Sequence, residues 1–179
     1  MTLALAPKLA QRLKKIKLVI LDNDGVMTDG RIVLGDRGDE LKFFDAQDGH
    51  GLVMLRRAGL KTVMISGKTS PVNKRRMKEL LFCDLYQKAT DKLVIFEKVL
   101  KKYRLKAEEV CYVGDDLIDL PPMTRAVFSV AVAGAVPEVR RAAHLVTRRR
   151  GGRGAVRETV DLLLKTQGLW KEVTRRYYR

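Results

Sequence analysis

Short apolar runs alternate with stretches of helical spacing along most of the chain. Four runs have the length and branching of buried strands: 17–21, 60–66, 110–114 and 126–133. Three intervening segments carry helical spacing or a helix-start signal: 49–59, 70–81 and 91–103. Strands separated by helices of this length predict an α/β fold, in which a parallel sheet is flanked by helices.

One segment, 31–44, departs from this rhythm. Two short alternating runs there flank a Gly-Asp-Arg-Gly turn, which predicts a β-hairpin inserted directly after the first strand. The hairpin is too short to be a second domain. We therefore expect one domain over 1–169, which ends in a glycine-rich turn and an amphipathic helix within 151–169, followed by a flexible basic tail at 170–179.

The composition is that of an ordinary globular protein. Of the 179 residues, 46% are hydrophobic, but no apolar run approaches the roughly 20 residues that span a bilayer. The first 15 residues contain no apolar stretch long enough for the core of a signal peptide. Cys83 and Cys111 lie in apolar sequence and cannot form a four-ligand zinc site by themselves. We expect a cytoplasmic protein with no membrane partner, whose two cysteines are reduced core thiols.

The charge is less ordinary. Lys and Arg number 36 against 21 Asp and Glu, which leaves a net charge of +15 and would suit a protein that binds nucleic acid or a membrane surface. The basic residues are instead spread over several segments, without the interleaved aromatic residues of a single-strand binding surface. This distribution favours solvated helix faces and a site for a small anion, with no nucleic-acid partner. A basic binding module stays open as an alternative of a different class.

Acidic and polar residues follow the predicted strands where each one ends, at the sheet edge where α/β folds bind ligands. The first strand is followed by Asp22 and Asp24, and the second ends in Ser66 and Gly67. Lys92 opens the next helix. The third strand is followed by three more carboxylates: Asp115, Asp116 and Asp119. Crowded carboxylates of this kind indicate a hard cation such as Mg²⁺, with a phosphate ester as the natural substrate.

These side chains predict a two-step phosphoryl transfer. The Asp22 carboxylate can attack phosphorus to give an aspartyl-phosphate, while Asp24 protonates the leaving alkoxide and later takes a proton from the attacking water. For the first role Asp24 must start protonated, which a neighbouring carboxylate and partial burial would favour. Ser66 and Lys92 would hold the phosphoryl oxygens. Each motif alone is a weak signal, but their order at successive strand ends favours a catalytic site.

The same residues resemble the four motifs of the haloacid dehalogenase superfamily of phosphotransferases: DNDGVMTDG, ISGK, the isolated Lys92 and GDDLIDL. The hairpin is similar to that of a small branch without a cap domain. So are four further sequences: FFDAQDGHG, YVGDDLIDLPPM, SVAVA and TRRRGGRGAVRE. The resemblance runs from about Lys17 to Gln167.

The resemblance implies a single Rossmann-like domain that depends on Mg²⁺ and hydrolyses 3-deoxy-D-manno-octulosonate 8-phosphate (KDO 8-phosphate) to KDO and inorganic phosphate, a step in making the lipopolysaccharide inner core. Asp22 would be the nucleophile and a metal ligand, Asp24 would add a backbone carbonyl to the metal, and Asp115 would be the third ligand. Asp116 would act in the outer shell. Members of the branch are tetramers in which the hairpins pair, so a homotetramer is also implied.

The resemblance also implies a set of substrate contacts. They are Asp24, Ser66, Gly67 and Lys92, together with Asp45, Ala46, Gln47, Asp48, Gly49, Lys68 and Arg76. Four positions depart from the usual pattern of the branch: Asp45, Gln47, Val53 and Lys68. Lysine is a point charge and cannot hold a carboxylate through the planar fork of an arginine. A related nine-carbon sugar acid, phosphorylated on its ninth carbon, is therefore the alternative substrate.

Overall fold

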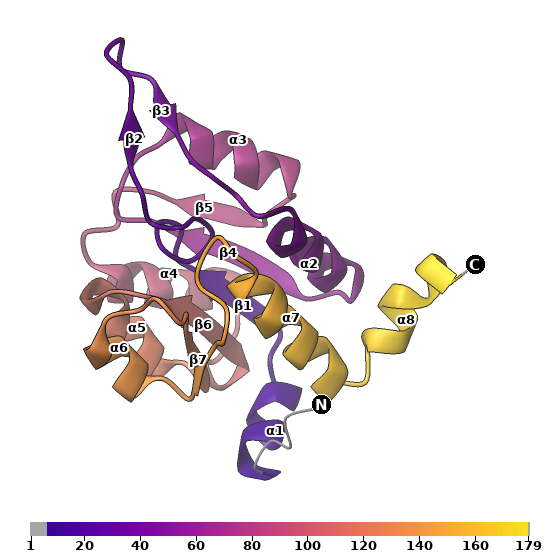
Figure 1. Ribbon diagram of the computed structural model, residues 1–179. Helices are drawn as coiled ribbons and strands as arrows, with labels where there is room; N and C mark the ends of the chain where they lie inside the picture. Colours follow the sequence, from indigo (N-terminus) through magenta and orange to yellow (C-terminus); the bar gives the residue numbers. More distant parts are fainter. Residues whose placement is uncertain (1–6, 179) are drawn as a thin grey trace.

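The computed structural model describes residues 7–178 and contains a central sheet with helices on both faces and a projecting hairpin (Figure 1). All neighbouring strands of the sheet are parallel. In their order of pairing the strands are β5 (Asp84–Tyr86), β4 (Lys61–Ile65), β1 (Leu18–Leu21), β6 (Val110–Gly114), β7 (Phe128–Ala131) and β8 (Leu145–Val146). The predicted α/β fold is confirmed.

The centre of the sheet is fully buried because helices cover it from both sides. Every residue of β1, β6 and β7 is buried, as expected of strands in a parallel sheet. From β1 the chain first adds β4 and β5 on one side and then β6, β7 and β8 on the other. Strands β1 and β6 are therefore neighbours at a topological switch point, with Leu21 opposite Val113. The residues that follow these two strands must lie side by side.

The helices form two groups, which lie on opposite sides of the sheet in Figure 1. One group is α1 (Pro7–Lys14), α2 (Ala46–Arg57) and α7 (Ala155–Thr166), and the other is α4 (Lys92–Tyr103), α5 (Leu120–Arg125) and α6 (Pro137–Ala142). Helix α3 (Pro71–Glu79) lies near the hairpin. Short 3₁₀ turns cover 107–109, 117–119 and 175–178. Over residues 7–178, no helix combines the length and the apolar character needed to cross a membrane.

The expected hairpin is present within 31–44. It consists of the antiparallel strands β2 (Val33–Leu34) and β3 (Glu40–Leu41), and it projects from the body of the molecule in Figure 1. Its apolar side chains are exposed: Leu34 by 71%, Leu41 by 60% and Phe43 by 56%. A hairpin with so little apolar burial of its own has a surface suited to a protein partner.

The structure corrects the expectation for the C-terminal segment. Residues 170–178 were predicted to be a flexible tail, but Trp170–Thr174 form helix α8 and the 3₁₀ turn follows it. Val173 and Thr174 are each only 6% exposed, so an apolar contact anchors this helix. Residues 1–6 and 179 of the predicted ends lie outside the described range.

A second correction concerns the cysteines. Cys111 is a buried thiol on β6, as predicted, and burial raises its pKa to about 12. Cys83 is exposed, because it lies in the turn between α3 and β5 rather than in a strand.

The short edge strands β5 and β8 are absent from the predicted elements. Two or three residues are too few to show a period in the sequence.

Candidate active site

Asp22 is placed by the sheet and by a tight loop. Its backbone N–H continues the ladder by donating to Val113 O over 3.0 Å. Directly after it, the carbonyl of Asn23 accepts from three successive N–H groups, those of residues 26, 27 and 28, and so turns the chain sharply. Gly25 adopts a φ of +97°, and a Cβ there would lie 2.0 Å from Asp115 Oδ2. Only glycine allows this loop to pass so close to the end of β6.

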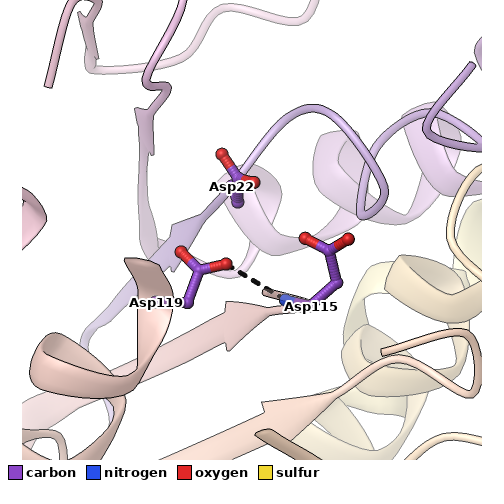
Figure 2. Close-up of side chains that lie close together, drawn as sticks. All are labelled: Asp22, Asp115 and Asp119. Carbon is purple, nitrogen blue, oxygen red and sulfur yellow. Dashed lines mark hydrogen bonds between the residues drawn. The ribbon is translucent and has the colours of Figure 1, made fainter. Parts of the chain in front are cut away.

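Three carboxyl groups converge beyond the ends of β1 and β6 (Figure 2). One oxygen from each of Asp22, Asp115 and Asp119 lies within 4.8 Å of the others. Asp22 is 6% exposed and Asp119 is 0% exposed, so the charges are largely removed from water. The sequence-based expectation that Asp22 and Asp115 meet at one point is confirmed.

Both carboxylate oxygens of Asp119 accept hydrogen bonds. Its Oδ1 accepts from Lys92 Nζ over 2.7 Å and from the Tyr112 hydroxyl over 2.9 Å. Its Oδ2 accepts from the backbone N–H groups of Asp115 and Asp116 over 3.1 and 3.3 Å. Asp119 therefore fixes the loop that carries Asp115 and orients Lys92. With four donors on its two oxygens, it has little capacity left to bind a metal ion.

Lys92 is the first residue of α4, and its side chain is 1% exposed. Its Nζ lies 2.8 Å from Asp22 Oδ1 and 2.7 Å from Asp119 Oδ1. Burial lowers the pKa of Lys92, but the two aspartates outweigh it, so its pKa lies above the ordinary value. Lys92 thus stays charged beside Asp22, as its predicted role requires.

Asp22 and Asp115 lie where the charged form of each carboxyl group is disfavoured. Burial, with a smaller contribution from Asp119, raises the pKa of Asp22 to about 7. Burial and then the neighbouring Asp22 raise the pKa of Asp115 to about 8. Asp115 Oδ1 is also buried and has no hydrogen-bond partner within residues 7–178. A divalent cation between Asp22 and Asp115 would satisfy this oxygen and offset the repulsion, so the donor set fits Mg²⁺.

Mg²⁺ is therefore expected to raise the unfolding temperature more at about pH 8.5 than at about pH 6. At the lower pH the ion must displace protons from both carboxyls, whose pKa values are about 7 and about 8. Thermal unfolding with and without Mg²⁺ at the two pH values measures this. Asp115→Asn is the control that should lose the shift, and an equal shift at both pH values would contradict the assignment of these ligands.

Asp24 has a different neighbour from the one expected. Its Oδ1 accepts from Asn23 Nδ2 over 2.9 Å and contacts Lys42 Nζ. Lys42 comes from the hairpin, its side chain is 1% exposed, and it also lies 3.3 Å from Glu40 Oε1. We expected a neighbouring carboxylate to favour protonated Asp24. The structure places an ammonium group there instead, because Lys42, directly after β3 at the base of the hairpin, reaches Asp24.

The predicted phosphate-binding residues lie next to this cluster. Ser66 follows β4, the strand that pairs with β1 on the other side from β6, and it is 0% exposed. Its Oγ lies 3.3 Å from the carbonyl of Lys68. Gly67 and Lys68 are exposed beyond it. Asp116 is exposed too, and its side chain accepts from the Leu117 N–H over 2.7 Å, which is a local cap.

The predicted sugar contacts divide into exposed and buried residues. Asp45 caps α2 by accepting from the N–H groups of residues 47 and 48, and Ala46 and Gln47 are exposed. Asp48 is 0% exposed and accepts from the N–H groups of residues 154 and 157, so it holds the start of α7 and cannot reach a substrate. Burial outweighs these bonds and raises the pKa of Asp48 to about 6.

Gly49 and Arg76 are in contact with each other. Gly49 is buried, and a Cβ there would lie 2.4 Å from Arg76 Nη2. The Arg76 guanidinium lies over the Phe44 ring and pairs with Glu79 over 2.9 Å. Gly49 therefore makes room for the arginine rather than contacting a ligand itself. Arg76 Nε is buried and has no hydrogen-bond partner in the described residues.

A basic pocket borders the acidic cluster. Arg31, Arg150 and Arg153 line it together with Asp29 and Asp115. The glycine-rich turn brings Arg150 and Arg153 close to the loop after β1, since a Cβ on its first glycine, residue 151, would lie 1.7 Å from the carbonyl oxygen of residue 25. From the sequence, the run Arg148 to Arg150 is most simply a solvated one, although it could also add positive potential for an acidic sugar phosphate; the structure places Arg150 at the border of the site.

Comparisons with known proteins place this arrangement among phosphatases. The family model described as haloacid dehalogenase-like hydrolase matches residues 76–157. The chain is 44% identical over 162 residues to the 3-deoxy-D-manno-octulosonate 8-phosphate phosphatase of Yersinia pestis, an overlap of 90% of this chain and 87% of that protein.

Two solved structures are closely similar. A probable YrbI-family phosphatase from Pseudomonas syringae has a TM-score of 0.94 and 42% identity, and the match covers 97% of this chain and 99% of that one. The 3-deoxy-D-manno-octulosonate 8-phosphate phosphatase of Moraxella catarrhalis, solved with magnesium, phosphate and KDO, has a TM-score of 0.93 and 35% identity, covering 95% and 98% of the two chains.

Proposed function

Because this chain belongs to the 3-deoxy-D-manno-octulosonate 8-phosphate phosphatase family of haloacid dehalogenase-like hydrolases, we propose that it hydrolyses KDO 8-phosphate to KDO and inorganic phosphate. The reaction is the hydrolysis of a phosphoric monoester and belongs to lipopolysaccharide biosynthesis. The observation that carries the proposal is the buried Asp22, paired with Lys92 and facing Asp115. A cytoplasmic location stays a prediction.

Asp22 acts as the nucleophile. Its carboxylate attacks phosphorus, the bond from phosphorus to the sugar oxygen breaks, and an aspartyl-phosphate forms. Lys92, 2.8 Å from Asp22 Oδ1, favours the charged form of the carboxylate and stabilises the negative phosphoryl oxygens together with Ser66. Asp22, Asp115 and the backbone carbonyl of Asp24 would hold Mg²⁺, with Asp116 in its outer shell, and the bound ion would supply further neutralisation of the phosphoryl charge.

Asp24 moves the protons. It gives a proton to the sugar oxygen as that oxygen leaves, and it later takes one from the water that hydrolyses the intermediate. Its position two residues after Asp22, with Oδ1 anchored by Asn23 and Lys42, supports this role. Because Lys42 and Asn23 contact Oδ1, the first proton is carried on Oδ2 or arrives on the monoanionic phosphate group of the substrate.

The sugar acid is expected to bind on the solvent side of these residues, where basic side chains favour an anion. Ser66, Gly67, Lys68 and Arg76 remain the proposed contacts, with Asp45, Ala46 and Gln47 at the exposed start of α2. The basic pocket adds positive potential beside the site, which favours a substrate with both a phosphate and a carboxylate. Asp48 and Gly49 are buried and do not contact the substrate: Asp48 holds the start of α7, and Gly49 makes room for Arg76.

We also propose that the protein forms a homo-oligomer, a tetramer by likeness to its branch. The exposed apolar hairpin supports this, because Leu34, Leu41 and Phe43 would be covered by a second copy. Pairing of hairpins would also protect their strand edges. The number of copies rests on the family alone.

A substrate panel tests the proposed activity. Phosphate release is measured with and without Mg²⁺ for KDO 8-phosphate, for nine-carbon keto-deoxy sugar acid 9-phosphates and for unrelated phosphate esters. We expect kcat/KM to be highest for KDO 8-phosphate and to depend on Mg²⁺. A higher value for a nine-carbon ester would favour the alternative substrate, and similar values for all esters would rule out a dedicated enzyme.

A further inference from the structure

Two buried asparagines lie directly behind Asp24. Asn23 and Asn73 are both 0% exposed, and Asn23 Nδ2 donates to Asn73 Oδ1 over 2.9 Å. The same Nδ2 donates to Asp24 Oδ1, also over 2.9 Å. Asn23 belongs to the loop after β1, whereas Asn73 belongs to α3, so the amide pair ties the acid/base residue to a separate helix.

The amide pair is part of a closed ring of polar contacts. On α3, the backbone N–H of Asn73 lies 3.3 Å from Ser70 Oγ, and that hydroxyl contacts the Glu40 carboxylate on the hairpin. Lys42 then joins Glu40 to Asp24 Oδ1. The ring reaches Asp24 from two sides, and both contacts fall on the same carboxylate oxygen. Neither of these contacts involves the other oxygen, Oδ2, which can therefore take part in the proton transfer.

The amide pair is a poor arrangement for stability alone. Asn23 Oδ1 and Asn73 Nδ2 are buried, and neither has a hydrogen-bond partner within residues 7–178. Buried polar atoms without partners destabilise a fold, and two apolar side chains of similar shape would fill the same space without that penalty. A role that needs an amide donor at this point accounts for the pair better than packing does.

We propose that the Asn23–Asn73 pair is a positioning device that holds Asp24 with Oδ2 toward the leaving oxygen of the substrate. The inference rests on the proposed function, in which Asp24 donates a proton. As the phosphorus–oxygen ester bond breaks and the bond from phosphorus to Asp22 forms, the proton on Asp24 Oδ2 passes to the departing oxygen. Neither asparagine needs to touch the substrate. Without the amide contact only Lys42 holds Oδ1, and the carboxyl group can turn away from the line of transfer.

The test compares two leaving groups. A sugar alkoxide needs a proton as it leaves, whereas p-nitrophenolate leaves without one, so only the first reaction depends on a correctly placed Asp24. kcat/KM for KDO 8-phosphate and for p-nitrophenyl phosphate is measured on wild type, on Asn73→Leu and on the double variant Asn23→Leu with Asn73→Leu. We expect both variants to lose about tenfold on the sugar ester and less than about threefold on the aryl ester.

A measurement of thermal stability distinguishes a positioning role of the two asparagines from a packing role. The unfolding midpoint of the double variant is expected to match or exceed that of wild type, because the unpaired polar atoms are gone. Thr159→Val, which changes a buried polar residue of α7, is the matched control and should leave the ratio of the two kcat/KM values unchanged. If the leucine variants do not fold, Asn73→Ala removes the amide without adding volume.

Equal losses on both esters, or no loss on either, would overturn the positioning role. A wild-type protein that hydrolyses p-nitrophenyl phosphate but not KDO 8-phosphate would instead overturn the proposed substrate. The same two variants are then compared on the sugar phosphate that the wild type does hydrolyse, and an unchanged ratio there overturns the inference in turn.

Discussion

Asp22→Asn is expected to lower phosphate release by a factor on the order of 10⁴ or more, because the amide cannot attack phosphorus and no aspartyl-phosphate can form. Ser66, Lys92 and Asp115 would still bind the phosphoryl group and the metal in part, so substrate binding should fall much less than turnover. Steady-state kinetics with KDO 8-phosphate and Mg²⁺ measure both.

The same substitution should leave the fold intact. Burial raises the pKa of Asp22 to about 7, so without metal the folded state binds more protons than the unfolded chain between about pH 4 and pH 7. Ionised Asp22 therefore costs stability increasingly as the pH rises through that window, and asparagine removes this cost. Without Mg²⁺, we expect the gain in unfolding free energy to be larger at pH 8 than at pH 5.

Asp161→Asn is the control for this experiment, since Asp161 pairs with Arg157 on α7, away from the acidic cluster. Its turnover should match that of wild type. Activity of Asp22→Asn within tenfold of wild type, in protein freshly purified and free of deamidation, would rule out covalent catalysis by this residue.

Much of the catalytic cluster could be predicted because it follows from sheet topology. Asp22 and Asp115 each come directly after an apolar strand, and the carboxyl ends of neighbouring parallel strands meet at one edge. Lys92 is the first residue of α4, which follows β5 in the chain. A residue at this point also lies at the carboxyl edge of the sheet, so the order of elements along the chain predicts its position. No distant contact had to be guessed.

The contacts around Asp24 could not be predicted in this way. Lys42 belongs to a hairpin whose alternation suggests an exposed, solvated lysine, yet its side chain is 1% exposed. Asn73 is a polar residue within a basic helix, and its partner is fifty positions away. Hydrophobic periodicity tells which face of an element is buried, but it does not identify the polar residue that meets another polar residue there.

Resemblance alone was a weaker guide to the first turn of α2. Asp48 was expected to contact the sugar, but its two oxygens bind the backbone at the start of α7, and that helix follows more than a hundred residues later. A family motif records that a residue recurs. The structure separates a residue that touches the ligand from one that holds the loop beneath it.

Asp119→Asn is expected to destabilise the protein by about 3–5 kcal/mol, the usual cost of breaking a buried, hydrogen-bonded ion pair. Each oxygen of Asp119 accepts from two donors, Lys92 and Tyr112 on one side and two backbone N–H groups on the other. An asparagine must turn its own NH₂ group toward one of these donor pairs, whichever way the amide lies. No rotation of the side chain relieves the conflict.

Activity should fall with stability, because Lys92 and the Asp115 loop lose the group that orients both. Denaturant unfolding measures the change in free energy, and Asp116→Asn is the matched control on the same loop. Asp116 is exposed and uses one oxygen to cap the Leu117 N–H, which an asparagine oxygen can also do, so its change should stay within about 0.5 kcal/mol. Equal stabilities for the two variants would mean that the four contacts of Asp119 contribute nothing net, and that Lys92 is held in place by Asp22 alone.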